Sequence, residues 1–536
     1  MPKPKLKLML SGIWYLISGI SKLHTFIPKF PEMKKLGLAV ILSFLLLSPV
    51  FAQTPSFISD SLDSYIKRGM ADWNIPGLAI AIVKDGKVIL MKGYGVREVG
   101  KPALVDENTL FIIASNTKLF TGTSLAKLEN EKKISLDDRV TKYIPWFRLY
   151  DSNVTRMVTI RDLLCHRLGT KTFQGDFTFW NSNIPRDSII WKMRLLKPSQ
   201  QFRQDYGYCN SAFLTAGQII PVVTGMSWEN YVQENILKPL AMNNTYMLTA
   251  GMEKRNNVAV PYSNAFGELS KLPYDQVDNL GPATSMVSCV SDLTHWLLMQ
   301  LDSGRYQGQT IVPWPAVQKT RDANILTGSR KSPYYPTHFR AYGLGENMTD
   351  YNGRQVYWHT GGAFGFVTNV CFVPEEKLGI TILTNNDNQN FFEALRYQIL
   401  DAYLGVPYTN RSRFQMGFAT QTRADMERRI KSLRERTQKI NKPDNLDQFT
   451  GDYSNELYGR ITITRDGDKL RMSFSKHPNL TASLEYMDNN AFMMTYSNIA
   501  YGIFTANFSA ANGKINAVEI KMNDFVEFDP YTFHKK

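Results

Sequence analysis

The chain changes its sequence pattern near residue 405, and one arrangement of strands and helices does not account for both sides of that boundary. Before it, β-rich runs at 78–83 and 87–95 and strand-like runs between 355 and 385 enclose a long stretch of helical apolar spacing. After residue 446, only short strand-like runs separated by turns follow. Because 536 residues also exceed one compact core, the sequence predicts separately folded units joined by a linker.

The first folded unit is expected over residues 53–405. Between its two groups of strands, apolar residues recur at helical spacing in four segments: 117–131, 160–166, 211–224 and 227–239. Strands at both ends with helices between them favour one mixed antiparallel sheet, formed from distant parts of the chain, together with a helical subdomain. The predicted class is therefore α/β in the α+β sense.

The remaining residues are expected to form a linker and a second, smaller unit. Residues 406–445 include the charged run "TRADMERRIKSLRERTQKINKPDN", which is typical of a solvated helical linker. Residues 446–536 contain the dipeptides Asp466-Gly467 and Asn512-Gly513, both strong hairpin signals. About 90 residues of strands and turns without a helical pattern predict a small all-β barrel.

Residues 1–52 are expected to be an upstream extension followed by a signal peptide. The segment "MKKLGLAVILSFLLLSPVFAQ" begins at Met33 with two lysines, continues as an uncharged apolar run and ends in small residues. It predicts cleavage after Ala52 and export, so that the mature protein is periplasmic or secreted. The alternative is a retained membrane anchor, since the run is near the lower limit for spanning a bilayer. Whether translation starts at Met1 or Met33 stays open.

The net charge of +14 does not indicate nucleic-acid binding. The first 52 residues hold seven Lys against one Glu, and without them 55 basic residues face 47 acidic ones, which leaves +8. This excess is spread along the chain with no basic block among aromatics, so no nucleic-acid partner is expected. The expected partner is a small-molecule or short-peptide substrate, and a homo-oligomer is compatible with the sequence.

Metal or cofactor binding is not expected from the residues that usually supply it. The chain has seven His and no H-E-x-x-H motif, and its cysteines form no C-x-x-C pair. The cysteines are far apart in sequence and are expected to be mainly buried thiols: Cys165, Cys209, Cys289 and Cys371.

Four Ser-x-x-Lys matches occur, and their surroundings distinguish them: Ser64/Lys67, Ser115/Lys118, Ser124/Lys127 and Ser473/Lys476. Ser64 lies in a charged first helix, Ser124 in mid-helix where its hydroxyl would face its own backbone, and Ser473 in a strand of the second unit. Ser115 alone stands where an apolar strand-like run gives way to a helix. It is therefore the candidate nucleophile.

Ser115 and Lys118 together have the properties of a nucleophile and its base. A serine at the first turn of a helix lies beside unpaired backbone N–H groups that stabilise developing negative charge. A spacing of three places Lys118 on the same helix face. A lysine acts as a base only when neutral, which requires burial or a neighbouring positive charge that lowers its pKa.

Two further motifs supply complementary chemistry. Tyr208 and Asn210, in "YGYCNSAF", form a Tyr-x-Asn motif in which a phenol can relay a proton and an amide can hold a lysine or a substrate carbonyl. His359 and Thr360 begin the sequence "HTGGAFGF" between two strand-like runs. Taken singly, each motif has an ordinary structural interpretation as a capped helix start or a turn.

In this order and at these distances, the three motifs resemble those of the penicillin-recognising serine hydrolases. The chain is more specifically similar to the class C β-lactamase-related family, whose members include β-lactamases, D-aminopeptidases, DD-peptidases and esterases. The likeness covers about residues 57 to 405 and includes "IPGLAIAIVKDGKVI", "VTIRDLLCHRLG" and "LKPLAMNNTYM". The tail resembles a lipocalin-like barrel found on some exported members. The resemblance implies a β-lactamase/transpeptidase-like fold.

The resemblance also implies a role for each matching residue. Ser115 is expected to be acylated, with Lys118 as its base. Tyr208 is expected to protonate the leaving group and then activate the deacylating water, while Asn210 orients Lys118 and the substrate amide. The backbone N–H groups of Ser115 and Gly362 are expected to form the oxyanion hole.

The triplet His359, Thr360 and Gly361 is expected to line the substrate site, and it departs from the family pattern at its first position. Members that bind penicillins or D-Ala termini usually carry Lys where this chain has His359. A histidine of ordinary pKa is mostly neutral at pH 7 and holds a substrate carboxylate less well. We therefore expect hydrolysis of an amide, peptide or ester rather than of a β-lactam.

Two alternatives to this interpretation stay open at the level of sequence. The first is a true β-lactamase, which shares the chemistry. The second is a non-catalytic binding or scaffold protein that keeps the fold, because fold likeness alone does not prove activity. His166, in "LLCHRLG", is interpreted as a packed or capping histidine rather than a catalytic one.

Overall fold

The computed structural model describes residues 54–438 and 445–536. The expected signal peptide and its cleavage site at Ala52 lie outside these residues. In the part of the chain that is described, no helix is both long and apolar enough to cross a bilayer.

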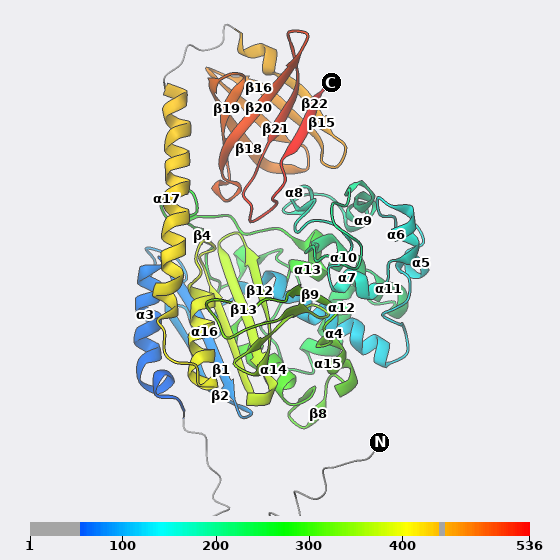
Figure 1. The fold of residues 1–536 in the computed structure, drawn as a ribbon, viewed down its shortest axis with the longest axis vertical. Helices are drawn as coiled ribbons and strands as arrows, with labels where there is room; N and C mark the ends of the chain where they lie inside the picture. Colours follow the sequence, from blue (N-terminus) through cyan, green and yellow to red (C-terminus); the bar gives the residue numbers. More distant parts are fainter. Residues whose placement is uncertain (1–53, 439–444) are drawn as a thin grey trace, which may run out of the picture. The chain divides into compact units, whose positions relative to one another are not determined.

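An eight-stranded sheet forms the centre of the first folded region (Figure 1). Every pair of neighbouring strands in it is antiparallel. The N-terminal hairpin joins the last strand of this region, because β1 pairs with β14, so distant parts of the chain meet as predicted. In sheet order the strands are β2 (Lys87–Gly95), β1 (Gly77–Lys84), β14 (Leu378–Thr384), β13 (Phe366–Val373), β12 (Arg354–Ala363), β11 (Asn347–Tyr351), β10 (Arg340–Tyr342) and β9 (Ile325–Gly328).

The alternation of side chains along β1 divides the core into two layers. Leu78, Ile80 and Ile82 pack in one apolar cluster with residues of α3 (Leu62–Asp72) and α16 (Phe391–Leu404). Ala79, Ala81 and Val83 point to the other face, toward the cluster that contains α14 (Val290–Leu301) and the helical region. Both faces of the sheet are therefore covered by helices, which explains why β1 is apolar from Leu78 to Val83.

The helical region contains most of the segments predicted from apolar spacing. Segment 117–131 is α4 (Thr117–Asn130), and segment 160–166 begins with α7 (Ile160–Leu164). Segment 211–224 is two helices instead of one, since Pro221 has no N–H to continue the hydrogen-bond ladder across Gln218. The region's helices, beyond those already given, are α5 (Val140–Tyr143), α6 (Ser152–Met157), α8 (Asp176–Phe179), α9 (Arg186–Lys192), α10 (Asn210–Gly217), α11 (Ile219–Thr224), α12 (Trp228–Val232), α13 (Gly281–Thr284) and α15 (Trp314–Thr320).

Short paired strands accompany these helices. They are β3 (Phe111–Ile112) with β6 (Val287–Ser288), β4 (Tyr262–Ser263) with β5 (Ser270–Lys271), and β7 (Arg305–Tyr306) with β8 (Gln309–Thr310). The first of these pairs leads directly into the turn that carries Ser115.

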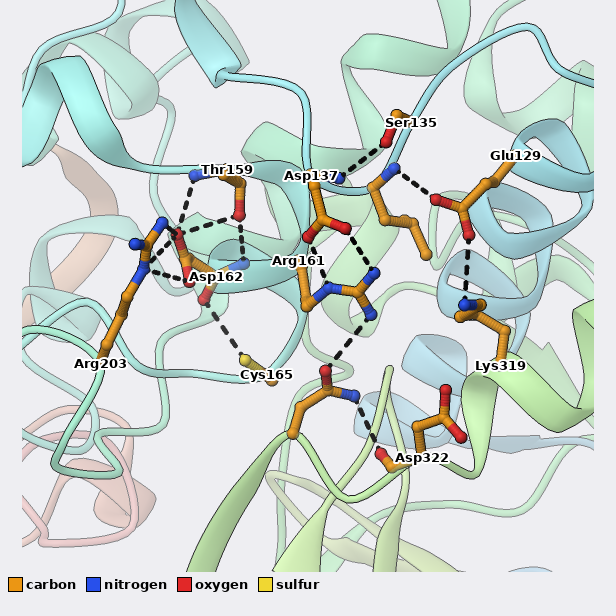
Figure 2. A network of polar contacts seen from close by, with 12 residues as sticks. Glu129, Ser135, Asp137, Thr159, Arg161, Asp162, Cys165, Arg203, Lys319 and Asp322 are labelled. Carbon is orange, nitrogen blue, oxygen red and sulfur yellow. Dashed lines mark hydrogen bonds and ion pairs between the residues drawn. The ribbon is translucent and has the colours of Figure 1, made fainter.

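A buried carboxylate, Asp162, ties α7 to the segment that leads to Tyr208 (Figure 2). Its oxygens accept hydrogen bonds from the guanidinium groups of Arg167 at 2.6 Å and Arg203 at 2.8 Å. It also accepts from the backbone N–H of Thr159 in a capping box at the start of α7. Burial raises the pKa of Asp162, but the two arginines and the Thr159 N–H outweigh it and hold the pKa below its usual value.

The C-terminal region is a closed antiparallel barrel of eight strands, as predicted. Residues 57–536 pack as one compact unit that includes both the barrel and the first region. Between them, α17 (Arg411–Gln438) lies within the stretch expected to be the linker. The barrel strands are β15 (Gly451–Asn455), β16 (Gly459–Asp466), β17 (Lys469–Phe474), β18 (His477–Asp488), β19 (Ala491–Tyr496), β20 (Ile503–Ala511), β21 (Lys514–Ile520) and β22 (Tyr531–Lys535).

Candidate active site

Ser115 lies on a tight turn between strand β3 and helix α4. The turn is a 3-10 segment, Ala114–Asn116, and Ala114 has a φ of +45°, an unusual value for a residue with a side chain. The Asn116 amide fixes it by donating to the Ile113 carbonyl at 3.1 Å and to the Thr368 hydroxyl on β13 at 2.8 Å. The turn thus holds Ser115 against the central sheet, at the first turn of a helix.

The neighbouring strand β12 approaches this turn closely at a glycine. A Cβ on Gly361 would lie 1.9 Å from the Ile113 carbonyl oxygen, so no other residue fits there without movement of the backbone. This close approach brings the following residue, Gly362, to the same pocket wall as Ser115.

Lys118 is completely buried one turn further along α4, behind Ser115. Its Nζ lies 2.7 Å from Asn210 Oδ1, 2.9 Å from the Ala283 carbonyl oxygen and 3.2 Å from Ser115 Oγ. Burial lowers the pKa of Lys118 well below its ordinary value, and the opposing effect of Asp176 is smaller. Asn210 and Ala283 offer only acceptors to Nζ, so a neutral amine would satisfy both with its two N–H bonds and would turn its lone pair toward the Ser115 hydroxyl.

The first residue of α10, Asn210, is held from both ends of its amide. Its Oδ1 accepts from Lys118, and its Nδ2 donates to Asp176 Oδ2 at 2.6 Å. Asp176 is the first residue of α8 and is 3% exposed. Burial raises the pKa of Asp176 to about 7, against the effects of Asn210 and Lys118. A carboxyl, an amide, an amine and a hydroxyl therefore form one chain that ends at Ser115.

Tyr208 lies beside Ser115 with its ring packed against His166, at a centroid distance of 4.2 Å. Burial raises the pKa of the Tyr208 phenol well above its ordinary value, and the interaction with the Ser115 side chain opposes this rise. The hydroxyl has no hydrogen-bond partner of standard geometry within residues 54–438 and 445–536. Tyr208 thus has a buried phenol near Ser115 whose raised pKa favours the protonated form.

His166 and His359 are both neutral in these surroundings. His166 Nδ1 accepts from the Cys209 N–H at 3.0 Å, which agrees with its interpretation as a packed histidine. His359 Nδ1 lies 2.8 Å from the Thr360 carbonyl and therefore carries the hydrogen, so its Nε2 accepts from the Tyr342 hydroxyl at 3.0 Å. Burial, with a smaller contribution from the nearby Lys118, lowers the pKa of His359 to about 3.

The pocket in front of Ser115 has a volume of about 380 Å³. Two of its lining residues come from the barrel, in the loop between β21 and β22. One of them, Phe525, covers Gly362 so closely that a Cβ on that glycine would lie 2.8 Å from the ring. The residues that line it are Ser115, Thr172, Phe173, Asp176, Trp180, Tyr206, Tyr208, Asn210, Asn347, Trp358, His359, Thr360, Gly362, Phe525 and Val526.

The structure brings most of the sequence-predicted residues together around this pocket. Ser115, Tyr208, Asn210, His359, Thr360 and Gly362 line it, Lys118 lies directly behind Ser115, and Gly361 packs against the Ser115 turn. Asp176, Phe525 and Val526 also line the pocket and were not expected from the sequence, because they stand in no recognisable motif. The four cysteines are buried free thiols, and Cys209 contacts the Ser211 hydroxyl at 3.2 Å.

This fold and this arrangement of a serine, a buried lysine and a tyrosine agree with the comparison with protein families. Residues 62–417 match the family Beta-lactamase. The chain belongs to this family of serine hydrolases, which confirms the resemblance inferred from the three motifs. Residues 435–535, which include the barrel, match a second family that is described as a domain of unknown function (DUF3471).

The chain is also similar to individual known proteins. It is 28% identical over 350 residues to Protein flp of Staphylococcus aureus (strain NCTC 8325 / PS 47), which covers 63% of this chain and 66% of that protein, just under two thirds. It is 25% identical over 432 residues to Unguisins hydrolase ungD' of Aspergillus campestris (strain IBT 28561), covering 75% of this chain and 77% of that protein. Among solved structures, the octameric penicillin-binding protein homologue from Pyrococcus abyssi shares the fold, with a TM-score of 0.57 and 24% identity over 88% of this chain and 99% of that one.

Proposed function

We propose that this protein is an exported serine hydrolase that cleaves an amide, peptide or ester through an acyl-enzyme on Ser115. Membership of the beta-lactamase family supports hydrolysis by a serine. A relative named as a hydrolase of unguisins supports catalysis over a purely binding role. The apolar segment that ends at Ala52 supports export.

The observation that carries the proposal is the burial of Lys118 behind Ser115. The Lys118 side chain has no exposed surface, and its Nζ lies 3.2 Å from Ser115 Oγ. The Asn210 amide and the Ala283 carbonyl satisfy this buried nitrogen, and the contact with Ser115 Oγ places it where it can act on the hydroxyl. With its pKa held well below the ordinary value by burial, Lys118 can act as a general base toward Ser115.

In the acylation step, Lys118 Nζ takes the proton of the Ser115 hydroxyl as Oγ attacks the substrate carbonyl. The carbonyl oxygen becomes an oxyanion, which the backbone N–H groups of Ser115 and Gly362 are expected to stabilise. When the bond to the leaving group breaks, Tyr208 gives that group the phenolic proton, and the Lys118 ammonium returns a proton to Tyr208. The high pKa of Tyr208 suits this order, because the phenol is protonated at the start.

In the deacylation step, a water molecule attacks the acyl carbon in the place that the leaving group occupied. Tyr208 and Lys118 accept the water proton in the reverse of the first sequence, and the bond to Ser115 Oγ breaks. The proton then returns to Ser115, which restores the starting state. The acyl-enzyme thus divides one difficult hydrolysis into two easier steps.

The substrate class follows from the charge and shape of the pocket. His359 is neutral, with its two nitrogens engaged by Thr360 and Tyr342, so it offers no positive charge to a substrate carboxylate. The walls include the aromatic residues Phe173, Trp180, Trp358 and Phe525. We therefore expect an uncharged or apolar acyl group at this position, and we rank β-lactams below amides, peptides and esters.

The proposal is tested by intact-protein mass spectrometry after exposure to a fluorophosphonate probe and, separately, to a penicillin. The expected result is one fluorophosphonate adduct, mapped to Ser115, without a penicilloyl adduct. A lasting or rapidly released penicilloyl adduct would instead assign β-lactam recognition. No adduct from either reagent would overturn the hydrolase and favour a binding role.

Two parts of the proposal need separate measurements. Export is tested by N-terminal sequencing of the protein from the cell exterior or periplasm, where residue 53 is the expected first residue. The octameric state named for the Pyrococcus abyssi neighbour motivates a light-scattering measurement of the mass in solution.

A further inference from the structure

A loop of the barrel, residues 521–530 between β21 and β22, reaches the catalytic region and contains a buried carboxyl group. That group belongs to Glu527, which is 2% exposed. Glutamate is rarely this buried unless its oxygens have partners. Its partners therefore indicate why the barrel places it there.

The Glu527 carboxyl holds the backbone on both sides of Asp176. Oε1 accepts from the Gly175 N–H at 2.8 Å, and Oε2 accepts from the Phe177 N–H at 3.0 Å. The Tyr531 hydroxyl, on β22 of the barrel, donates to Oε2 at 2.8 Å. Two of the three contacts thus reach from the barrel to the catalytic region, and they flank a single residue.

Asp176 is the residue that orients the amide of Asn210, which in turn contacts Lys118. The position of Asp176 depends on residues 175 and 177, because its backbone is bonded to both of them. Gly175 has a φ of +88°, a left-handed conformation that glycine adopts without a side-chain clash, and its N–H is held in this conformation by Glu527. A shift of the Asp176 backbone would be passed on to Asn210 and to the lone pair that faces Ser115.

We propose that Glu527 of the barrel is a positioning residue for the catalytic lysine, acting through Asp176 and Asn210; this rests on the proposed function above. The barrel is then a part of the active-site framework, and its role is more than the attachment of a second domain. Glu527 touches neither Ser115 nor the substrate pocket, so its effect is on the geometry of Lys118.

Other contacts already attach the barrel to the catalytic region, so Glu527 is not needed merely as a tether. The ring of Phe177 stacks on Tyr458 at 5.2 Å and on His477 at 5.3 Å, both in the barrel. His477 Nε2 also contacts the Trp180 carbonyl at 2.8 Å. An exposed ion pair, Lys171 to Asp529 at 2.9 Å, joins the same barrel loop to the catalytic region.

The two accepting oxygens of the Glu527 carboxyl group make E527Q an informative substitution. Burial, with a smaller contribution from the neighbouring Asp176, raises the pKa of Glu527 to about 8, so the group is partly protonated near neutrality. In either protonation state both carboxyl oxygens accept a hydrogen bond. A glutamine has the same shape but only one accepting atom, so E527Q keeps one backbone contact and loses the other.

The test compares E527A and E527Q with the wild-type protein and with D529N as the matched control. D529N removes an exposed contact of the same loop with the catalytic region, at a side chain that does not touch Gly175 or Phe177. The rate of fluorophosphonate labelling of Ser115 is measured over a range of probe concentrations, which separates the maximal rate from probe affinity. Thermal unfolding is recorded for each protein, and E527A is repeated in a D176A background.

We expect E527A to lower the maximal labelling rate by about tenfold to 100-fold, in line with the effect of small misplacements of catalytic groups. E527Q should fall between E527A and the wild type, and D529N should stay within about twofold of it, because its ion pair is exposed. In the D176A background, E527A should slow labelling little further, since both changes interrupt the same chain. Amide hydrogen exchange around residues 173–178 should be faster in E527A than in D529N.

Three results would overturn the proposal. Wild-type labelling rates in E527A and E527Q would show that the contact has no catalytic effect. Equal losses in E527A and D529N, or effects of E527A and D176A that multiply fully, would assign Glu527 to domain attachment alone. A wild-type protein that the probe does not label would overturn the proposed function and this proposal with it, whereas the first two results leave the hydrolase intact.

Discussion

Helix α4 carries the Ser-x-x-Lys motif at both of its ends, and the two copies have different surroundings. At the start, Ser115 precedes the helix on a strained turn, and Lys118 is fully buried behind it. Toward the end, Ser124 donates its hydroxyl hydrogen to the Phe120 carbonyl at 2.8 Å, within its own helix, as the sequence predicted. Lys127 is half-buried, and its Nζ lies 3.5 Å from the Asn235 carbonyl.

The Ser-x-x-Lys spacing alone therefore places a serine near a lysine, and the surroundings of the pair determine whether the lysine can act as a base. Burial lowers the pKa of both lysines, but that of Lys118 falls well below its ordinary value while that of Lys127 shifts less. The hydroxyl of Ser115 faces the lysine nitrogen, whereas that of Ser124 is occupied by backbone. One helix thus contains a candidate catalytic pair and an internal control for it.

The largest expected effect comes from removing the nucleophile at one end of α4 only. Ser115→Ala should abolish fluorophosphonate labelling and all hydrolysis, because it removes the hydroxyl that lies against Lys118 Nζ. Ser124→Ala should keep the wild-type labelling rate, since it loses only a bond to its own helix. Intact mass spectrometry checks both, with circular dichroism to establish that each variant is folded. Labelling of Ser115→Ala at another serine would contradict the assignment.

The next effect comes from the two lysines. Lys118→Met should slow acylation by about 10²- to 10⁴-fold, the usual contribution of a general base. Lys127→Met should change the rate by less than about twofold, as expected for a side chain that neither contacts substrate nor supports the site. Stopped or quenched labelling reactions measure the rates. Equal rates in the two variants would remove the functional difference between the ends of the helix.

A third substitution tests the role of the Tyr208 phenol separately from the role of Lys118. Tyr208→Phe removes the proton that the leaving group needs, so turnover of an ester or amide should fall by about 100-fold or more. Tyr206→Phe is the matched control, because Tyr206 lines the same pocket two residues away. Steady-state hydrolysis compares the two. A Tyr208→Phe enzyme with full turnover would assign the proton transfer to Lys118 alone.

The pH dependence tests whether Lys118 works as a neutral base. Below the pKa of Lys118 the acylation rate should rise about tenfold per pH unit as the ammonium loses its proton, and above it the rate should level off. Because the pKa is depressed by burial, the plateau should begin well below pH 10.5. Lys127→Met should have the same profile as the wild type. A rate that keeps rising to pH 10.5 would mean that Lys118 has the pKa of an exposed lysine.

The same depressed pKa has a consequence for stability. Between the folded-state pKa of Lys118 and its ordinary value, the unfolded chain binds one proton more than the folded chain, so the free energy of unfolding contributed by this group rises with pH. This stabilising contribution decreases as the pH falls through the same window, and it is gone below the folded-state pKa of Lys118. Lys118→Met has no such group, so its stability relative to the wild type should decrease as the pH rises through this window in denaturant titrations.

The sequence predicted the inner part of the site but not its outer part, and the reason is physical. Ser115 and Lys118 are one helical turn apart, and Tyr208 and Asn210 begin a helix, so their arrangement is set by local structure. Asp176 lies in a four-residue helix without a motif, and Phe525 reaches the pocket from about 400 residues away along the chain. Such contacts depend on how the barrel packs, which local spacing does not encode.

The same distinction applies to the fold. The helical spacing of 117–131 and the hairpin signals of the barrel predicted elements that the structure contains, because both are local patterns. The pairing of β1 with β14 was expected only in outline, as distant segments in one sheet. The division of 211–224 into two helices had a local signal in Pro221, and continuous apolar spacing concealed it.

The smallest expected effect concerns the choice of acyl group by Phe525 and not the reaction of Ser115 with Lys118 as its base. Phe525→Ala should leave the rate with a small acyl ester nearly unchanged and should improve kcat/KM for bulkier acyl groups by about tenfold, the lower end of what a change in apolar pocket volume gives. The reason is that the ring covers Gly362 beside the expected oxyanion hole, where the acyl group has to lie. Phe418→Ala, which removes an exposed ring from α17, is the matched control and should change neither substrate. If instead both substrates slowed equally in Phe525→Ala, the barrel loop would support the Ser115 and Lys118 geometry without selecting the acyl group, and the difference between the two ends of α4 would then depend on the barrel as well as on the helix.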